Sequence, residues 1–98
     1  MYKMTSLLIL DESTLEFIKN KQLVSSIQWL QNNVPKFFSD CRYGISVLNN
    51  DLLALKIYGQ SFNAEEFRKL RHDFCKALID EEHHALYDVI SIFQRKSQ

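Results

Sequence analysis

Glycine and proline, the residues that most readily end helices and form tight turns, are almost absent from this chain. Its 98 residues contain two glycines and one proline, and all three lie between positions 35 and 59. Glycine supplies the positive-φ positions of turns, and proline removes a backbone donor and stops helices. The sequence therefore predicts a central turn-bearing segment between two long regular stretches, 1–34 and 60–98.

Length and composition indicate one globular domain. Ninety-eight residues are close to the common domain size, and 46% of them are hydrophobic. The apolar run at residues 7–10 is too short for a membrane span, which needs about 20 residues, or for a signal peptide, whose apolar region has about 7–15. We therefore expect a single compact domain, 1–98, that is cytoplasmic, with Cys41 and Cys75 reduced.

The charges of the chain cancel. Twelve basic and twelve acidic side chains give a formal net charge of zero. A nucleic-acid-binding protein usually has a basic surplus, because neutralising phosphates supplies most of the affinity. The balance argues against a nucleic-acid partner, although folding could still gather a basic patch within it.

The first part of the chain is predicted to form a strand and two helices. Residues 5–10 are a short apolar run that ends in polar residues, which is typical of a buried strand. A helix is expected to follow, capped by Ser13 or Thr14. Its apolar stripe changes phase near residues 19–22, which predicts a break and a second helix. That helix should end before Pro35.

Residues 42–58 carry a hairpin pattern. Apolar side chains alternate with others on both sides of Asn49, Asn50 and Asp51, which are residue types that tolerate left-handed turn conformations. One face of the hairpin is apolar and should meet the helices. The predicted fold class is therefore α+β, with a small antiparallel sheet (the central hairpin plus the N-terminal strand) and helices packed on one face.

A third helix has the clearest start in the chain. Asn63 is a good N-cap, and Glu66 stands at the capping-box spacing. Phe62 and Phe67 match the positions of a hydrophobic staple around that cap. Apolar residues at helical spacing then mark its buried face, namely Phe67, Leu70, Phe74 and Leu78.

The C-terminal third admits three interpretations. One helix could run from residue 64 to 96, or Asp80 could cap a second helix. Alternatively, the β-branched run at residues 89–93 could form a strand, which would give the ferredoxin-like order βαββαβ. We expect a helix over 85–95, because neither face of such a strand alternates cleanly.

The densest group of potential metal ligands lies at residues 80–84, with Asp88 nearby. On a helix, Glu81, His84 and Asp88 would share one side. Zinc sites normally need three or four converging ligands, and di-iron bundles need more than one Glu-x-x-His pair. We therefore expect an exposed acidic helix surface and no metal or cofactor, and a metal-dependent enzyme that uses Glu81 and His84 is the less favoured hypothesis.

A basic stripe on the third helix is the candidate nucleic-acid site. Its members are Arg68, Lys69, His72 and Lys76, which could contact phosphates. Acidic residues interleave them, which favours a solvated face with i,i+4 ion pairs. The chain has no nucleophile elbow, P-loop or dinucleotide-binding glycine motif. We therefore predict no catalytic residues and a function other than catalysis.

These exclusions favour a small protein-binding module that acts by occlusion or assembly of a partner protein, as inhibitors, antitoxins, immunity proteins and adaptors do. Trp29 lies off the apolar stripe of its helix and could anchor an interface, since tryptophan is common at binding hot spots. The candidate contact residues are Trp29, Glu81, Glu82, His84 and Asp88. A homodimer through the C-terminal helix is a further expectation. The alternative function is a ferredoxin-like RNA-binding regulator or nuclease.

Overall fold

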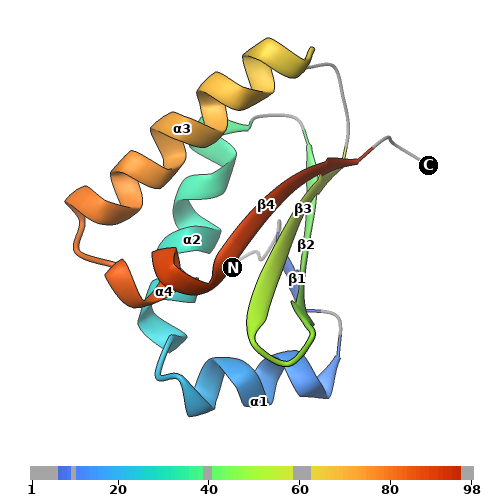
Figure 1. Ribbon diagram of the computed structural model, residues 1–98, viewed down its shortest axis with the longest axis vertical. Coiled ribbons are helices and arrows are strands. Elements are labelled where there is room, and N and C mark those ends of the chain that lie inside the picture. The colour runs from blue at the N-terminus through green and yellow to red at the C-terminus, as the bar shows by residue number, and fades with distance from the viewer. Residues whose placement is uncertain (1–6, 10, 39–40, 59–62, 96–98) are drawn as a thin grey trace, which may run out of the picture.

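The computed structural model describes residues 7–9, 11–38, 41–58 and 63–95, and these form four strands and four helices (Figure 1). In chain order the elements are β1 (Leu7–Ile9), α1 (Glu12–Asn20), α2 (Val24–Phe37), β2 (Arg42–Leu48), β3 (Leu52–Tyr58), α3 (Ala64–Asp80), α4 (His84–Val89) and β4 (Ile90–Arg95). The predicted α+β class is confirmed.

The strands form one mixed sheet in the order β1-β2-β3-β4. The predicted hairpin is confirmed as the antiparallel pair β2–β3, with Asn49 and Asn50 at φ 55° and 62° in its turn. The predicted N-terminal strand is present as β1, while Thr5, Ser6 and Leu10 lie outside the described residues. β1 runs parallel to β2, and β4 runs parallel to β3. The sheet is thus mixed, where an antiparallel one was predicted.

Each parallel strand pair is joined by a crossover of two helices, as parallel pairing requires. The two strands of each pair are direct neighbours, whereas the ferredoxin-like fold splits its βαβ units with another strand. The ferredoxin-like alternative is therefore not confirmed.

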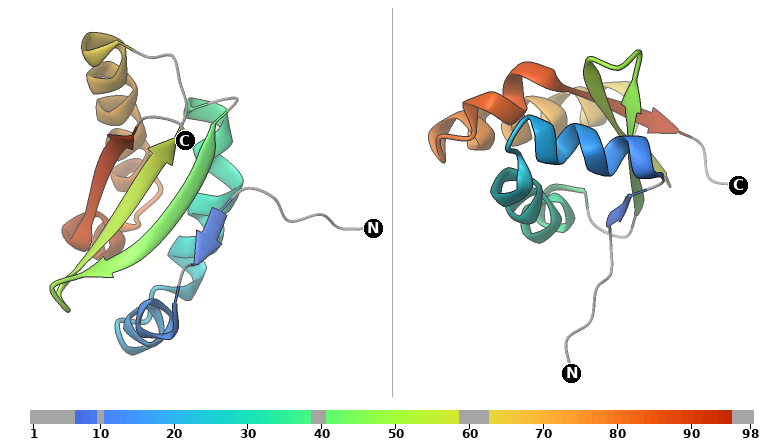
Figure 2. Two further views of the ribbon diagram at one scale, coloured as in Figure 1. Left: turned by 90° about the vertical axis from the view of Figure 1, so that its right-hand side faces the viewer. Right: turned by 90° about the horizontal axis from the view of Figure 1, so that it is seen from below.

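The helices pack on one face of the sheet, as predicted (Figures 1 and 2). The two parallel pairs run in opposite directions, so crossovers on the same face must have opposite hands. The views show that the β1–β2 connection is the left-handed one, a form found in only about 2% of such connections. This arrangement lets α2 and α3 share one core, which a right-handed first crossover would have divided between the two faces.

Asp11 caps α1, so the prediction of a cap at Ser13 or Thr14 is wrong. The Asp11 carboxylate accepts hydrogen bonds from the Thr14 N–H (2.9 Å) and hydroxyl (2.7 Å), and these bonds lower the pKa of that carboxyl. The buried Thr14 hydroxyl in turn accepts the N–H of Val47 at 3.0 Å. Thr14 therefore joins the start of α1 to β2 instead of capping the helix.

The turn between α1 and α2 has the same conformation as the turn between α3 and α4, and neither turn contains glycine. Gln22 and Glu82 adopt the left-handed conformation, at φ 58° and 67°. The N–H of Leu23 bonds to the Ile18 carbonyl at 2.8 Å, and the N–H of His83 bonds to the Leu78 carbonyl at 2.8 Å. This is the Schellman pattern. The predicted break near residues 19–22 is confirmed.

Replacing Glu82 by glycine is expected to raise the free energy of unfolding by about 0.5–1 kcal/mol. The left-handed conformation costs a non-glycine residue about 1–2 kcal/mol, and the greater freedom of glycine in the unfolded chain offsets part of that gain. Urea denaturation measures the change. Glu81, at φ −92°, is the matched control, since glycine there relieves no strain and should destabilise. Equal effects of the two substitutions would contradict the prediction.

Pro35 lies inside α2, so the prediction that this helix ends before it is wrong. The proline falls in the last turn of the helix and removes the donor of one i→i−4 bond, and only two helical residues follow it. The N–H of Phe38 still bonds to the Val34 carbonyl at 2.9 Å. Near a helix end, the backbone bias before proline is outweighed by the burial of Val34 and Phe38.

The helix expected over 85–95 is correct only as far as Val89, where α4 ends and β4 begins. The alternatives of one helix to residue 96 and of a cap at Asp80 are also wrong, because Asp80 ends α3 and Glu82 then reverses the chain. Pairing with β3 and burial of Ile92 stabilise the strand. The predicted capping box of Asn63 and Glu66 is confirmed, and Phe62 lies outside the described residues.

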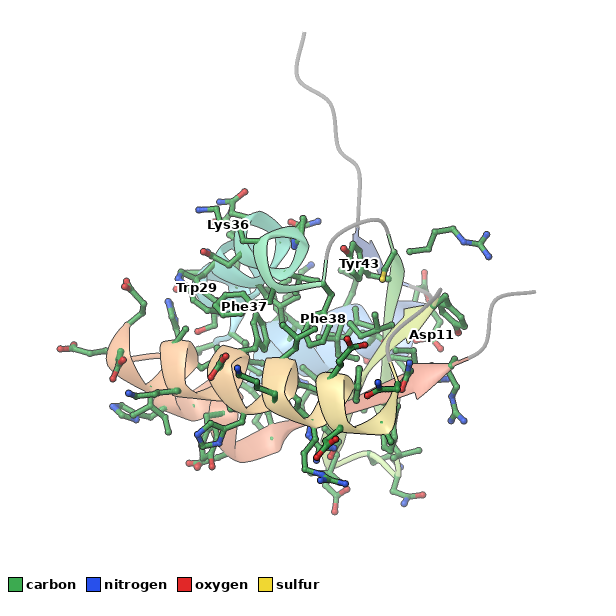
Figure 3. The ribbon with its side chains drawn as sticks, turned by 90° about the horizontal axis from the view of Figure 1, so that it is seen from above. Asp11, Trp29, Lys36, Phe37, Phe38 and Tyr43 are labelled. Carbon is green, nitrogen blue, oxygen red and sulfur yellow. The ribbon has the colours of Figure 1, made fainter. Side chains whose placement is uncertain are left out.

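Aromatic rings fill the space between α2, α3 and the sheet (Figure 3). The ring of Phe74 lies 5.3 Å from Phe37, 5.6 Å from Trp29 and 6.1 Å from Phe38, measured between centroids. Phe38 also contacts Phe67, at 5.5 Å. Edge-on and tilted pairs of this kind add about 0.5–1.5 kcal/mol beyond their burial. This aromatic cluster fixes how the two crossovers pack together.

Candidate functional site

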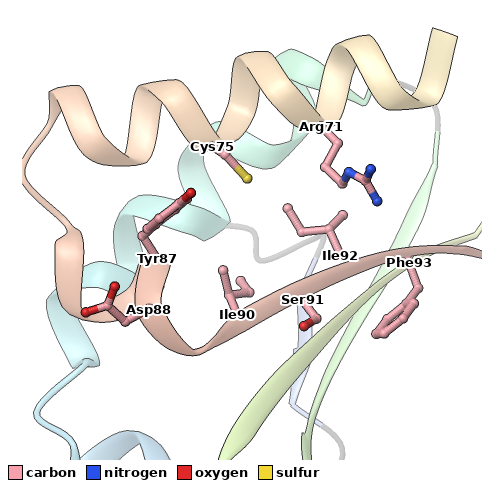
Figure 4. A pocket seen from close by; sticks show the side chains of 8 residues that line it. All are labelled: Arg71, Cys75, Tyr87, Asp88, Ile90, Ser91, Ile92 and Phe93. Atoms are coloured by element: carbon pink, nitrogen blue, oxygen red, sulfur yellow. The ribbon is translucent and has the colours of Figure 1, made fainter. Parts of the chain in front are cut away.

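β4 is the last strand of the sheet, and beside it runs an open groove of about 490 Å³ (Figure 4). Within the described residues β4 pairs with β3 alone, so no described strand lies along its other edge. Such an edge is a template for pairing with another chain. The groove and the edge together form the candidate site.

Side chains from α3, α4 and β4 line the groove. They are Arg71, Cys75, Tyr87, Asp88, Ile90, Ser91, Ile92 and Phe93. Arg71 and Cys75 stand one helical turn apart on α3, so they face the same way. Figure 4 places Arg71 and Asp88 at opposite ends of the groove, with Cys75 and Tyr87 between them.

Cys75 and Tyr87 lie in the groove between two opposite charges, those of Arg71 and Asp88. Tyr87 keeps 42% of its surface exposed, so part of its ring is accessible to a ligand in the groove. Burial raises the pKa of the Cys75 thiol, and the nearby Arg71 guanidinium only partly offsets this effect. Cys75 is therefore a neutral thiol that contributes apolar surface, and it lacks the thiolate character that nucleophilic catalysis needs.

Of the five candidate contact residues, the structure places only Asp88 in the groove. Trp29 is half-buried and stacks on Phe74 and on the His83 ring, whose centroid is 5.2 Å away. The His83 ring also hydrogen-bonds the Ser26 hydroxyl at 2.8 Å. These contacts place Trp29 in the packing between the two crossovers.

The other three candidates lie where the chain turns from α3 into α4. Glu81, Glu82 and His84 are exposed there. Across the part of the chain that the structure describes, no three His, Cys, Asp or Glu side chains come together as metal ligands. Glu81, His84 and Asp88 therefore do not converge on one point.

The basic stripe lies on the solvent side of α3. Its four residues, Arg68, Lys69, His72 and Lys76, are all exposed. Glu65, Glu66 and Asp73 are exposed on the same helix, as the charge pattern suggested. None of these four residues lines the groove.

Sequence reasoning did not select Tyr87, and it gave the strand that became β4 only as an alternative to the favoured helix. The available signal was the pair Ile90 and Ile92, which alternates with Ser91 at the period of a strand. The continuing helical periodicity from α3 concealed this signal.

Among the residues described, no helix is both long and apolar enough to cross a membrane. Comparison of the chain with protein-family models, curated proteins and solved structures gave no match.

Proposed function

We propose that this protein is a protein-binding module that captures an extended segment of a partner protein along the free edge of β4. The partner strand would continue the sheet by backbone hydrogen bonding, and the groove would receive its side chains. Occlusion or assembly of the partner would follow from that capture. The observation that carries the proposal is that β4 is the last strand of the described sheet and that its outer edge lies beside the groove.

The chemistry of the groove supports an extended peptide as its occupant. In strand addition, main-chain hydrogen bonds supply affinity, and pockets for alternate side chains supply specificity. Cys75, Tyr87 and Ile90 offer apolar surface to such side chains. Arg71 and Asp88, at opposite ends, would favour a segment with an acidic and a basic residue at matching positions.

A random-peptide display library, panned against the whole chain, tests the proposal. We expect enriched peptides to bind as extended strands and to protect β4 amides from hydrogen exchange. Methylating alternate backbone nitrogens of an enriched peptide should abolish binding, because it removes the main-chain donors. Replacing Tyr87 by alanine should weaken binding about tenfold or more, as loss of an aromatic anchor does.

Leu15 provides the matched control, since it is 43% exposed and lies on α1, away from the groove. Leu15→Ala should leave the affinity for the peptide unchanged. Three results would overturn the proposal: no enriched peptide, binding that is insensitive to backbone methylation, or equal losses in the two variants. A stable dimer that pairs its β4 edges and excludes the peptide would assign the edge to self-association instead.

A further inference from the structure

The outer face of the sheet, opposite the helices, is bare in the described structure (Figure 2). Side chains alternate along each strand, so those that leave the core point outward. Tyr43, Ile45 and Leu55 are among the inward set, which packs in the core. The charged and aromatic residues at outward positions of β2, β3 and β4 are Arg42, Lys56, Tyr58, Phe93 and Arg95. We term this group the basic-aromatic face.

The charges of this face are all positive. β1, β2, β3 and β4 contain three charged residues, Arg42, Lys56 and Arg95, and the strands contain no acidic residue. All three cations occupy outward positions. Acidic residues instead lie on the helices and in the hairpin turn, for example Glu66 and Asp51. The helices carry charges of both signs, for example Lys69 and Glu65, whereas the charged residues of the strands are all basic.

Two aromatic rings lie among these cations. Tyr58 stands between Arg42 and Arg95 in one row across the strands, and Phe93 stands beside Lys56 in the next row. Both aromatic residues are only partly buried. The Arg95 guanidinium lies 5.6 Å from the centroid of the Phe93 ring, which is cation–π distance.

Small side chains border the aromatic pair. The outward positions beside it are Gly44, Ser46, Ala54 and Ser91. Gly44 and Ala54 are buried, whereas Ser46 and Ser91 remain partly exposed beside the rings. The serine hydroxyls can donate and accept hydrogen bonds there.

We propose that the basic-aromatic face binds single-stranded nucleic acid, with bases stacked on its two rings and phosphates paired with its three cations. Open sheets with exposed aromatic residues stack unpaired bases, and cations beside them follow the backbone. A duplex keeps its bases stacked internally and cannot use the rings. Tyr58 and Lys56 project from the side of the sheet opposite α4, whereas Phe93 also lines the groove, so that ring is shared with peptide capture.

Fluorescence anisotropy with labelled oligouridine, oligothymidine and a duplex of equal length tests the proposal. Both single strands should bind at low salt, and the duplex should bind more weakly. Three phosphate contacts predict a slope of about −2 for log K against log salt, since each contributes about −0.7 on a single strand. Tighter binding of oligouridine would identify RNA as the preferred ligand, and tighter binding of oligothymidine would identify DNA. Either result supports the proposal.

Two substitutions separate stacking from charge. Tyr58→Ala should weaken binding about 5- to 150-fold without changing the salt slope, because it removes a stacking contact. Lys56→Gln should make the slope shallower by about 0.7. Substitution of Tyr58 is a more decisive test of base stacking than substitution of Phe93, because Phe93 also lines the groove.

Lys69→Gln on α3 is the control, since it removes an exposed cation of the basic stripe. It should leave both affinity and slope unchanged. Binding that depends on Lys69 and ignores Lys56 would move the site to the stripe and overturn the proposal. Absence of binding at low salt, or binding to phosphatidylserine vesicles and not to oligonucleotides, would overturn it as well.

Discussion

Replacing Phe74 by alanine is expected to lower the free energy of unfolding by about 3–5 kcal/mol. The ring is fully buried, and its centroid lies within 6.1 Å of those of Trp29, Phe37 and Phe38. Domains of this size are stable by about 5–15 kcal/mol, so the loss is a large part of the total. Urea denaturation, followed by circular dichroism, measures it, and the fluorescence of Trp29 should change because its neighbour is lost.

Phe93→Ala is the matched control for that substitution. It removes the same side chain from the outer face, where Phe93 is only partly buried, so no enclosed cavity remains. We expect a loss of about 1 kcal/mol or less. If the two phenylalanine variants were equally stable, the aromatic cluster would not be the centre of the core.

The local parts of the fold could be predicted from the sequence. The hairpin rests on the alternation within residues 42–58, and the start of α3 rests on Asn63 and Glu66. In each case, neighbouring residues determine the structure through turn conformation or capping. Such features depend little on the rest of the chain.

The parts that the sequence did not predict are those that depend on distant partners. β4 is a strand because β3 lies beside it and Ile92 meets the core, and no local signal outweighs the helical spacing before it. Parallel pairing of β1 follows from the placement of α1 and α2, which depends on packing of α1 against β2 and of α2 against α3. Glu82 reverses the chain without a glycine, so it gave no turn signal.

The candidate sites also depend on contacts between residues that are distant in the sequence. Asp88 was selected as part of an acidic cluster, yet its position in the groove depends on β4 lying below α3. The cations of the basic-aromatic face are far apart in the sequence, at positions 42, 56 and 95, so no charge run reveals them. They become neighbours only through the register of three strands.

If the basic-aromatic face and the edge of β4 bind as proposed, one sheet would serve two partners at once. A strand added to β4 would widen the sheet without covering the outer side of β2 and β3. A captured partner would then lie next to the nucleic acid bound at Tyr58. If both proposals hold, the isolated chain should bind a peptide and an oligonucleotide together, and Phe93 would be the residue through which each affects the other.

Replacing Leu55 by alanine is expected to cost about 2–5 kcal/mol of unfolding free energy. Leu55 is fully buried on β3, with Ile45 of β2 and Ile92 of β4 as its partners across the sheet. A cavity at this point loosens all three strands, so protection from hydrogen exchange should fall in β4 as well as in the hairpin. Leu48→Ala is the control, because Leu48 is 40% exposed and should cost no more than about 0.5 kcal/mol. Retained protection of β4 in a destabilised Leu55→Ala variant would show that β4 is held by the helices alone, contrary to the pairing with β3.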